Sequence, residues 1–271
     1  MFNVIKTKDG ANSLSTRDHG FTVGDGVFET IQTSAKGFLS LSRHLSRLER
    51  SAAIVKMSRP EIELIISLLE ELRQDARFVG HEFGRLRITW TTGESELGSL
   101  RSGNWTVAID WQEMKPQPAT ARIKISEYQK FSKSSVSGAK TTSYMENVIA
   151  LNEVKALGFD EAILLNESGF IAEGTSSNIF IVKDAQVFTP NLASGALAGI
   201  SRELLLENSP EIQEVELRAE DLMDADAVFL TSTTRDVQPV IQIGDLALAA
   251  DHPNVMELAQ RYRFAKLKEW Q

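Results

Sequence analysis

The sequence has no cysteine among its 271 residues. This absence excludes disulfides, iron–sulfur clusters, thiolate zinc sites and a cysteine nucleophile. Only four histidines occur, and their positions show no metal-ligand spacing, so we expect no metal site. No run approaches the roughly 18 apolar residues of a membrane span, and the residues after Met1 lack the apolar stretch of a signal peptide. We therefore expect a soluble, non-exported protein of the cytoplasm.

Basic residues are also fewer than acidic residues. Lysine and arginine number 29 against 37 acidic residues, which gives a net charge of −8. This balance argues against a nucleic-acid-binding surface. The remaining composition, 42% hydrophobic and 24% charged, is that of an ordinary globular protein. A chain of this length buries about three quarters of its unfolded surface, so it can form a core without disulfides or metals.

The first part of the chain combines helical and strand patterns. Apolar residues at helical spacing predict helices over 43–56 and 60–72, and period-two alternation predicts strands over 85–90 and 105–111. The two strands should form an antiparallel pair joined by the long polar loop 91–104. Lys115-Pro116-Gln117-Pro118 interrupts every pattern. We expect an α+β fold with a two-layer domain over 1–116 and a larger sheet-and-helix domain over 117–271.

Lys140 follows a small, flexible tripeptide and precedes a helical pattern that continues to about Leu157. We expect it at a helix N-terminus, where the positive end of the dipole disfavours the charged amine. A neutral amine is a nucleophile towards carbonyls, so one hypothesis is a Schiff base, and the alternative is a solvated surface lysine. The helix should bury a stripe formed by Tyr144, Val148, Leu151 and Val154, with Met145 and Ile149 beside it.

Several polar features elsewhere would suit a phosphorylated ligand. Hydroxyl-rich turns occur at 174–178, at Ser201 and at 232–234, and Arg47 lies in a predicted helix. Hydroxyls, backbone N–H groups at a helix start and an arginine are what a phosphate monoester requires. A lysine for a Schiff base and an acid, here Glu173, complete the requirements of pyridoxal phosphate. Taken singly, each feature is equally typical of helix caps, solvated side chains or simple turns.

The order of these motifs resembles the class IV, or fold type IV, pyridoxal-phosphate enzymes. The resemblance covers about residues 20–240. It is most specific in Asp160-Glu161-Ala162-Ile163-Leu164-Leu165-Asn166 and in Ala172-Glu173-Gly174-Thr175-Ser176-Ser177-Asn178, and it extends to Gly24-Asp25-Gly26-Val27-Phe28-Glu29-Thr30. The family includes branched-chain and D-amino-acid aminotransferases and 4-amino-4-deoxychorismate lyases. It implies a strongly curved, barrel-like second domain, a cofactor between the domains and a homodimer.

The resemblance also implies residue roles. Lys140 would carry the cofactor and move the proton, and Glu173 would contact the pyridine nitrogen. The other cofactor contacts, either on the phosphate or on the ring face, would be Arg47, Leu197, Ile200, Ser201, Ser232 and Thr233.

Two positions bear on the substrate. Phe28 stands where D-amino-acid aminotransferases usually carry a tyrosine, and the Arg-x-His pair of those enzymes is absent after the predicted strand. Arg235, three residues before Gln238-Pro239-Val240, resembles an arginine of the lyases and is a candidate carboxylate ligand; the alternative is a surface ion pair. The leading prediction is transamination between an amino acid and a 2-oxo acid. The alternatives are cleavage of aminodeoxychorismate to 4-aminobenzoate and pyruvate, and a non-catalytic cofactor-binding or scaffold protein.

Overall fold

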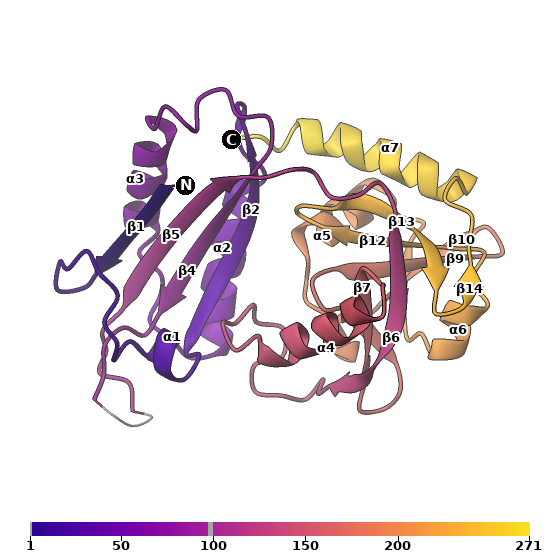
Figure 1. Cartoon of the computed structure of the whole chain (residues 1–271), viewed down its shortest axis with the longest axis horizontal. Helices are drawn as coiled ribbons and strands as arrows, with labels where there is room; N and C mark the ends of the chain where they lie inside the picture. The colour runs from indigo at the N-terminus through magenta and orange to yellow at the C-terminus, as the bar shows by residue number, and fades with distance from the viewer. Residues whose placement is uncertain (1, 97–99) are drawn as a thin grey trace. The chain divides into compact units, whose positions relative to one another are not determined.

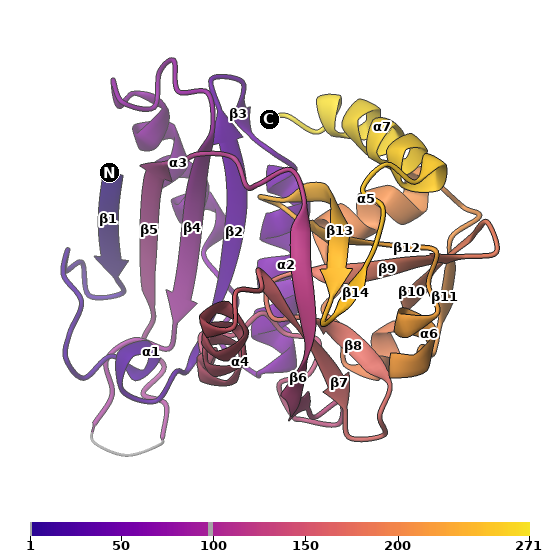
Figure 2. The same ribbon diagram turned by 45° about the vertical axis from the view of Figure 1, so that its right-hand side comes forward.

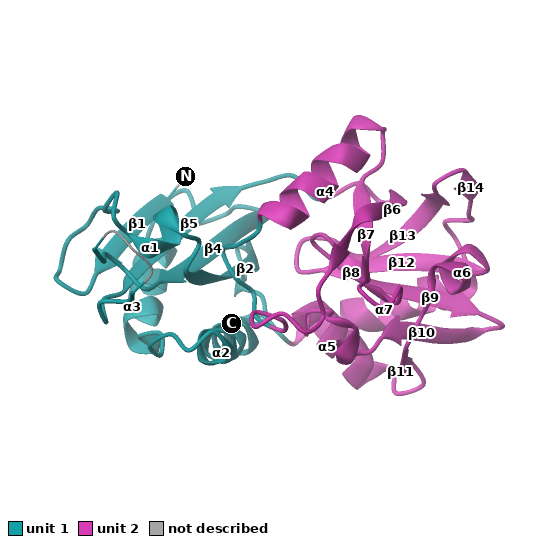
Figure 3. Ribbon diagram, turned by 90° about the horizontal axis from the view of Figure 1, so that it is seen from below, with its two compact units in different colours: residues 1–116, 139–144, 269–271 teal, residues 117–138, 145–268 magenta. Residues whose placement is uncertain are grey.

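A computed structural model describes residues 2–96 and 100–271 of the chain (Figure 1). The chain forms two compact units, coloured separately in Figure 3. Unit 1 comprises Met1–Pro116, Ala139–Tyr144 and Glu269–Gln271, and unit 2 comprises Gln117–Gly138 and Met145–Lys268. Lys140 therefore belongs to unit 1, although it follows residue 116 in the chain. The division into domains at residue 116 stays a prediction.

Unit 1 contains an antiparallel sheet in the order β1-β5-β4-β2-β3. Its strands are β1 (Phe2–Thr7), β2 (Gly26–Ser34), β3 (Gly37–Phe38), β4 (Gly84–Thr91) and β5 (Thr106–Glu113). The predicted antiparallel pair is confirmed as β4 and β5, in which Leu86 lies opposite Trp111 and Ile88 opposite Ile109. These four side chains are buried, so the period-two alternation marks the face that lies in the core.

Among the helices described in unit 1, α2 and α3 pack against this sheet, as Figure 2 shows. The helices are α1 (His19–Thr22), α2 (Leu41–Ile54) and α3 (Ile62–Arg73). Leu45 and Leu48 of α2 join Ile65 and Leu69 of α3 in one hydrophobic cluster with the buried face of the sheet. Burial of such side chains contributes about 1.5–3 kcal/mol each relative to exposure. The predicted helices are confirmed, with ends that differ by one or two residues.

Unit 2 is built on a second, mixed sheet in the order β11-β10-β9-β12-β13-β6-β7-β8, with β14 paired to β13. The strands are β6 (Ala121–Lys130), β7 (Glu161–Asn166), β8 (Ile171–Gly174), β9 (Asn178–Lys183), β10 (Gln186–Pro190), β11 (Gln213–Val215), β12 (Ala227–Ser232), β13 (Asp236–Ile243) and β14 (Leu246–Ala247). In Figure 2, β6 and β7 run across the direction of β9 and β12, so the sheet is strongly curled. The predicted α+β class with a curved second sheet is confirmed.

Both faces of the unit 2 sheet are buried where β9 and β12 lie. Ile179 and Ile181 of β9 belong to one hydrophobic cluster, and Phe180 and Val182 belong to another. The second cluster includes residues of α5 (Ile200–Asn208) and α7 (Pro253–Leu267), which cover that face. Remaining helical segments are α4 (Met145–Ala156), the 3-10 turn Leu192–Ser194 and α6 (Ala219–Met223). Burial on both faces explains why these strands are continuous apolar runs.

The predicted buried stripe of the helix after Lys140 is confirmed at Val154, with Leu151 partly buried beside it, and is wrong at Val148. Only Ala150 and Val154 of α4 are buried, and they pack on β7 residues. Met145 is 75% exposed, Val148 48% and Ile149 42%. The helix carries more apolar positions than the sheet of its own unit can cover. Among the described residues, no helix combines the length and apolar character that crossing a bilayer requires.

Candidate active site

The backbone at Lys140 is hydrogen-bonded to β2. Its carbonyl accepts a hydrogen bond from the Phe28 N–H at 2.9 Å, and its own N–H donates to Ser51 Oγ of α2 at 3.1 Å. Thr141 forms an isolated bridge with Val27. The expectation that Lys140 begins a helix is therefore wrong, because the helix starts only at Met145. Pairing with β2 holds the lysine at the edge of the sheet, so the lysine does not lie at the N-terminus of a helix.

The Gly24-Asp25-Gly26 turn is where the residues after Lys140 dock. Thr142 donates its N–H to Gly26 O at 2.8 Å and its hydroxyl to Gly24 O at 2.8 Å, and Ser143 Oγ donates to Gly24 O at 3.0 Å. A Cβ on Gly26 would lie 2.9 Å from Thr142 Oγ1, and Gly24 has φ +71°. Both glycines are thus required for the close approach. The sequence predicted only a turn here, since nothing local reveals a partner more than 110 residues away.

The Lys140 side chain lies among aromatic rings of unit 1. Its Nζ is 4.5 Å from the ring centroid of Phe28 and 5.8 Å from that of Tyr144, and the two rings meet edge to face. The Arg87 guanidinium also lies over the Phe28 ring, at 3.7 Å. Lys140 is only partly exposed. The amine predicted to be reactive is therefore confined by aromatic surfaces, and the solvated surface lysine is not what the structure shows.

Arg47 is buried beside two further polar side chains of unit 1. Its Nε and Nη2 donate to the two oxygens of Glu29 at 2.8 and 2.6 Å, and His44 Nδ1 lies 2.6 Å from Glu29 Oε2. Burial alone raises the pKa of the Glu29 carboxyl, but the Arg47 charge and the hydrogen bonds lower that pKa to about 2. Burial lowers the pKa of His44 and, together with the charges of Arg47 and Lys140, outweighs the hydrogen bond and the charge of Glu29, which raise it. The solvated helical arginine is excluded, and the phosphate role of Arg47 stays a prediction.

Glu173 lies on β8 in unit 2 with a side chain that is 9% exposed. Its Oε2 accepts the backbone N–H of Leu197 at 2.8 Å, and its Oε1 pairs with Lys130 Nζ at the end of β6. Both oxygens of this carboxyl group are therefore occupied by donors. Sequence reasoning missed Lys130, because no local pattern links residue 130 to residue 173.

The turn before α5 presents backbone donors. Gly199 is the N-cap and so offers no side chain, and Ser201 lies within the first turn of the helix. A Cβ on Gly199 would lie 2.0 Å from Asn178 Oδ1, and Asn178 Nδ2 donates to Leu197 O at 2.9 Å. Ser201 Oγ lies 3.0 Å from the hydroxyl of Tyr262. The first N–H groups of a helix have no intrahelical acceptor, so this terminus, starting at Ile200, suits an anion.

Buried Glu161 of β7 organises the hydroxyl-rich turn after Glu173. Its carboxylate accepts from the Thr175 N–H at 3.1 Å, from Ser176 Oγ at 2.6 Å and from Ser177 Oγ at 3.2 Å. Arg235 Nη2 donates to the same group at 3.2 Å. These hydroxyls therefore serve an internal carboxylate, a role that sequence reasoning missed. The sequence feature that could have indicated this role is the acidic residue Glu161 at the start of an otherwise apolar strand.

Arg235 is a largely buried residue, with 10% of its side chain exposed. Besides Glu161 it donates to Gln238 Oε1 at 2.6 Å, while Asp236 pairs with Lys266. The alternative of a surface ion pair does not hold, because Arg235 pairs with the buried Glu161, and its role as a substrate carboxylate ligand stays a prediction. Ser232 ends β12, and with Thr233 it forms the turn closed by the Arg235 N–H to Ser232 O bond of 3.1 Å. Their phosphate role also stays a prediction.

The sequence that carries this fold and these residues matches a known protein family. The profile of the family described as "Amino-transferase class IV" matches residues 26–243. The chain belongs to this family, and the family predicted from the sequence is confirmed. The match includes Lys140, the acidic motif around Glu173 and the part of the glycine-rich motif from Gly26 onward, and the family is one of enzymes.

Individual relatives differ in their named activities. A Methanocaldococcus jannaschii protein whose name assigns it as a branched-chain-amino-acid aminotransferase is 32% identical over 239 residues, which are 85% of this chain and 82% of that protein. The aminodeoxychorismate lyase of Bacillus subtilis is 28% identical over 246 residues, 86% of this chain and 82% of the lyase. The crystal structure of the branched-chain aminotransferase from Thermoproteus uzoniensis with norvaline has a TM-score of 0.88 at 26% identity, and covers 98% of this chain and 95% of that one.

The buried Glu29–Arg47 pair predicts a pH-dependent stability. Glu29→Gln leaves a buried guanidinium without its charge partner and should lower the free energy of unfolding by roughly 3 kcal/mol at pH 7. Because the folded-state pKa of Glu29 is lowered to about 2, its contribution is present above the ordinary value of 4.5 and is lost as pH falls towards 2. Urea unfolding at pH 7 and near pH 3 measures both effects.

The matched control is Glu70→Gln, which removes a carboxylate 61% exposed and 3.3 Å from Arg73 Nε. It should change the free energy by less than about 1 kcal/mol at either pH. Equal effects of the two substitutions at pH 7 would contradict a stabilising buried pair.

Proposed function

We propose that this chain is a pyridoxal-phosphate-dependent aminotransferase that moves an amino group between an amino acid and a 2-oxo acid. The observation that carries the proposal is the confined amine of Lys140 in a chain that matches the class IV family over residues 26–243. An amine held by its backbone on both sides and bordered by aromatic rings is suited to react at one fixed place.

The described residues fit the chemistry of the proposed cofactor. Unit 1 supplies an amine, at Lys140, which an aldehyde requires. Unit 2 supplies a carboxyl group, at Glu173, for a ring nitrogen, and the α5 terminus for a phosphate. When bound, pyridoxal phosphate supplies an aldehyde carbon and a ring that accepts electrons.

The proposed roles follow from these groups. Lys140 Nζ would hold the cofactor until the amine of a substrate displaces it. The freed Lys140 amine would then take the proton from the α-carbon of the substrate and deliver it to the cofactor carbon. Lys130 and the Leu197 N–H face the two oxygens of Glu173 and fix the position of the carboxylate, which is assigned to the ring nitrogen. Phosphate contacts are assigned to Arg47, Ile200, Ser201, Ser232 and Thr233, a ring contact to Leu197, and substrate contacts to Phe28 and Arg235.

Aminodeoxychorismate lysis is the second candidate. The lyase relative covers the chain as fully as the aminotransferase relative does, and Arg235 precedes Pro239 as expected from the lyases. Both reactions begin with removal of the same proton, so the same lysine and acid serve either. The identity of the substrate therefore decides between them, and the lyase is not better supported than the aminotransferase.

Purified protein with single amino acids and 2-oxo acids tests the proposal. We expect amino-group transfer, followed as conversion of the cofactor absorbance to that of pyridoxamine phosphate and as formation of the new amino acid. Glu173→Gln should slow it about a hundredfold or more, because several kcal/mol of stabilisation of the negative charge are lost. Release of pyruvate from aminodeoxychorismate without amino-group transfer would establish the lyase instead. The absence of both reactions would contradict both candidates.

We also propose a homodimer, which the exposed residues of α4 support. Met145, Val148 and Ile149 are apolar and 42–75% exposed on one helix. Exposed apolar groups gathered in this way are typical of surfaces that another chain covers. The cytoplasmic location expected from the sequence stays a prediction.

Val148→Glu should weaken this dimer, because a charge would have to be buried in the interface, and a rise in the dissociation constant of about tenfold or more is expected. Met256→Glu, at a 52% exposed position of α7 in the same unit, is the matched control and should leave the constant unchanged. Analytical ultracentrifugation over a concentration series measures both. A monomeric wild-type chain, or equal effects of the two variants, would contradict the proposal.

A further inference from the structure

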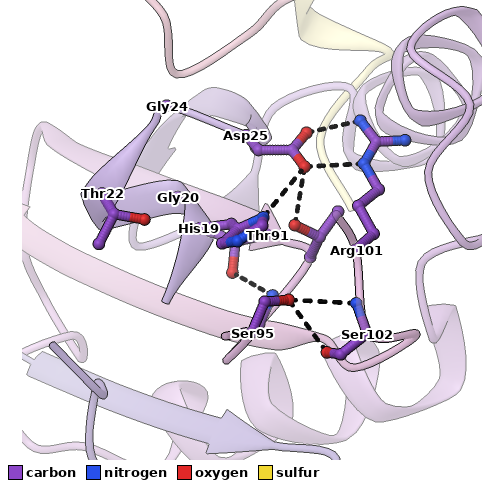
Figure 4. A network of polar contacts seen from close by, with 12 residues as sticks. His19, Gly20, Thr22, Gly24, Asp25, Thr91, Ser95, Arg101 and Ser102 are labelled. Carbon is purple, nitrogen blue, oxygen red and sulfur yellow. Dashed lines mark hydrogen bonds and ion pairs between the residues drawn. The ribbon is translucent and has the colours of Figure 1, made fainter. Parts of the chain in front are cut away.

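Asp25, between the two glycines that receive the Lys140 segment, is held by an arginine from the β4–β5 connection. Arg101 Nε donates to Asp25 Oδ2 at 2.7 Å and Nη2 donates to Oδ1 at 2.6 Å (Figure 4). Thr92 Oγ1 also donates to Oδ2, at 2.9 Å. Both carboxylate oxygens are therefore fixed, and a two-point pair of this kind sets the orientation of both partners. The function proposed above gives Asp25 and Arg101 no role.

The same guanidinium also reaches the end of α2. Arg101 Nη1 donates to Val55 O at 2.9 Å and to Lys56 O at 2.7 Å. Carbonyls at a helix C-terminus lack intrahelical donors and carry partial negative charge, so a cation there is favourable. Arg101 thus connects the turn that leads into β2 with the C-terminal end of α2.

These two elements are the supports of the Lys140 backbone. α2 supplies Ser51, whose hydroxyl accepts the Lys140 N–H. The turn and β2 supply Gly24 O and Gly26 O for the residues after Lys140, and the Phe28 N–H for its carbonyl. Any change in the spacing between the end of α2 and the turn would pull one of these hydrogen bonds apart. One side chain, Arg101, bridges that spacing.

We propose that Arg101 is a positioning residue for Lys140, acting through Asp25 and the end of α2. The inference rests on the proposed role of Lys140 and adds to it the residue that fixes the place of the amine. Arginine is required because lysine cannot hold both carboxylate oxygens while it donates to two carbonyls. A reactive group needs its supports fixed to within a fraction of an ångström, so loosening this bridge should slow the reaction with little effect on substrate binding.

The test compares Arg101→Gln and Arg101→Lys with Arg77→Gln in the full chain, with and without pyridoxal phosphate. Arg77 is a suitable control because it forms the same two-point pair, with Asp75, at 2.8 and 2.5 Å on the surface of unit 1. Hydrogen exchange resolved to single amides should show Phe28 and Thr142 exchanging about tenfold faster in both Arg101 variants. The amides between β4 and β5 should keep their rates, and Arg77→Gln should change neither set.

Activity gives the second readout. In both Arg101 variants kcat should fall about tenfold while KM changes less than about twofold, and the absorbance of the cofactor on Lys140 should change its pH dependence. Unchanged exchange at Phe28 and Thr142 would overturn the proposal, and so would equal acceleration across the whole sheet or full rescue by lysine. The exchange result does not depend on the reaction, so failure of Lys140 to bind the cofactor would refute the proposed function alone.

Discussion

The pairing of the Lys140 segment with β2 is the interaction on which the candidate site depends. A lysine in a flexible stretch would sample many positions, and ordering it costs about 1–2 kcal/mol per backbone residue. Here the cost is offset by backbone hydrogen bonds to Phe28 and Gly26 and by the Ser51 hydroxyl. The glycines at 24 and 26 allow the two backbones to approach closely enough for these bonds. The glycine-rich turn at residues 24–26 thus binds the segment that follows Lys140.

Each unit places a buried carboxylate beside the candidate residues. In unit 1 Glu29 holds Arg47 and His44, and in unit 2 Glu161 holds Arg235 and the turn at 175–177. A buried carboxylate with a full set of donors fixes several elements at once, but losing one partner leaves a charge unpaired. These networks hold together the elements around Lys140 and around Glu173. We therefore expect substitutions within them to be poorly tolerated.

The sequence predicted those parts of the structure that local patterns encode. Alternation in 85–90 and 105–111 identified the β4–β5 pair, and motif order identified the family. It could not predict which distant groups meet: Lys130 with Glu173, Glu161 with the hydroxyls, or Arg101 with Asp25. It also placed Val148 in the core, because periodicity shows that a helix has an apolar face and not whether its own unit covers that face. Hydroxyls at 175–177 were assigned to a ligand because an internal carboxylate acceptor leaves no local signature.

We infer that the hydrogen bonds which hold the backbone at Lys140 present this lysine, and no other lysine, to the cofactor. Reduction of the purified protein with borohydride in the presence of pyridoxal phosphate, followed by peptide mapping, tests it most directly. The account predicts that the reduced cofactor is found on the peptide that contains Lys140, and that Lys140→Ala abolishes the label. Label on Lys130 or on any other lysine, with Lys140 unmodified, would contradict it.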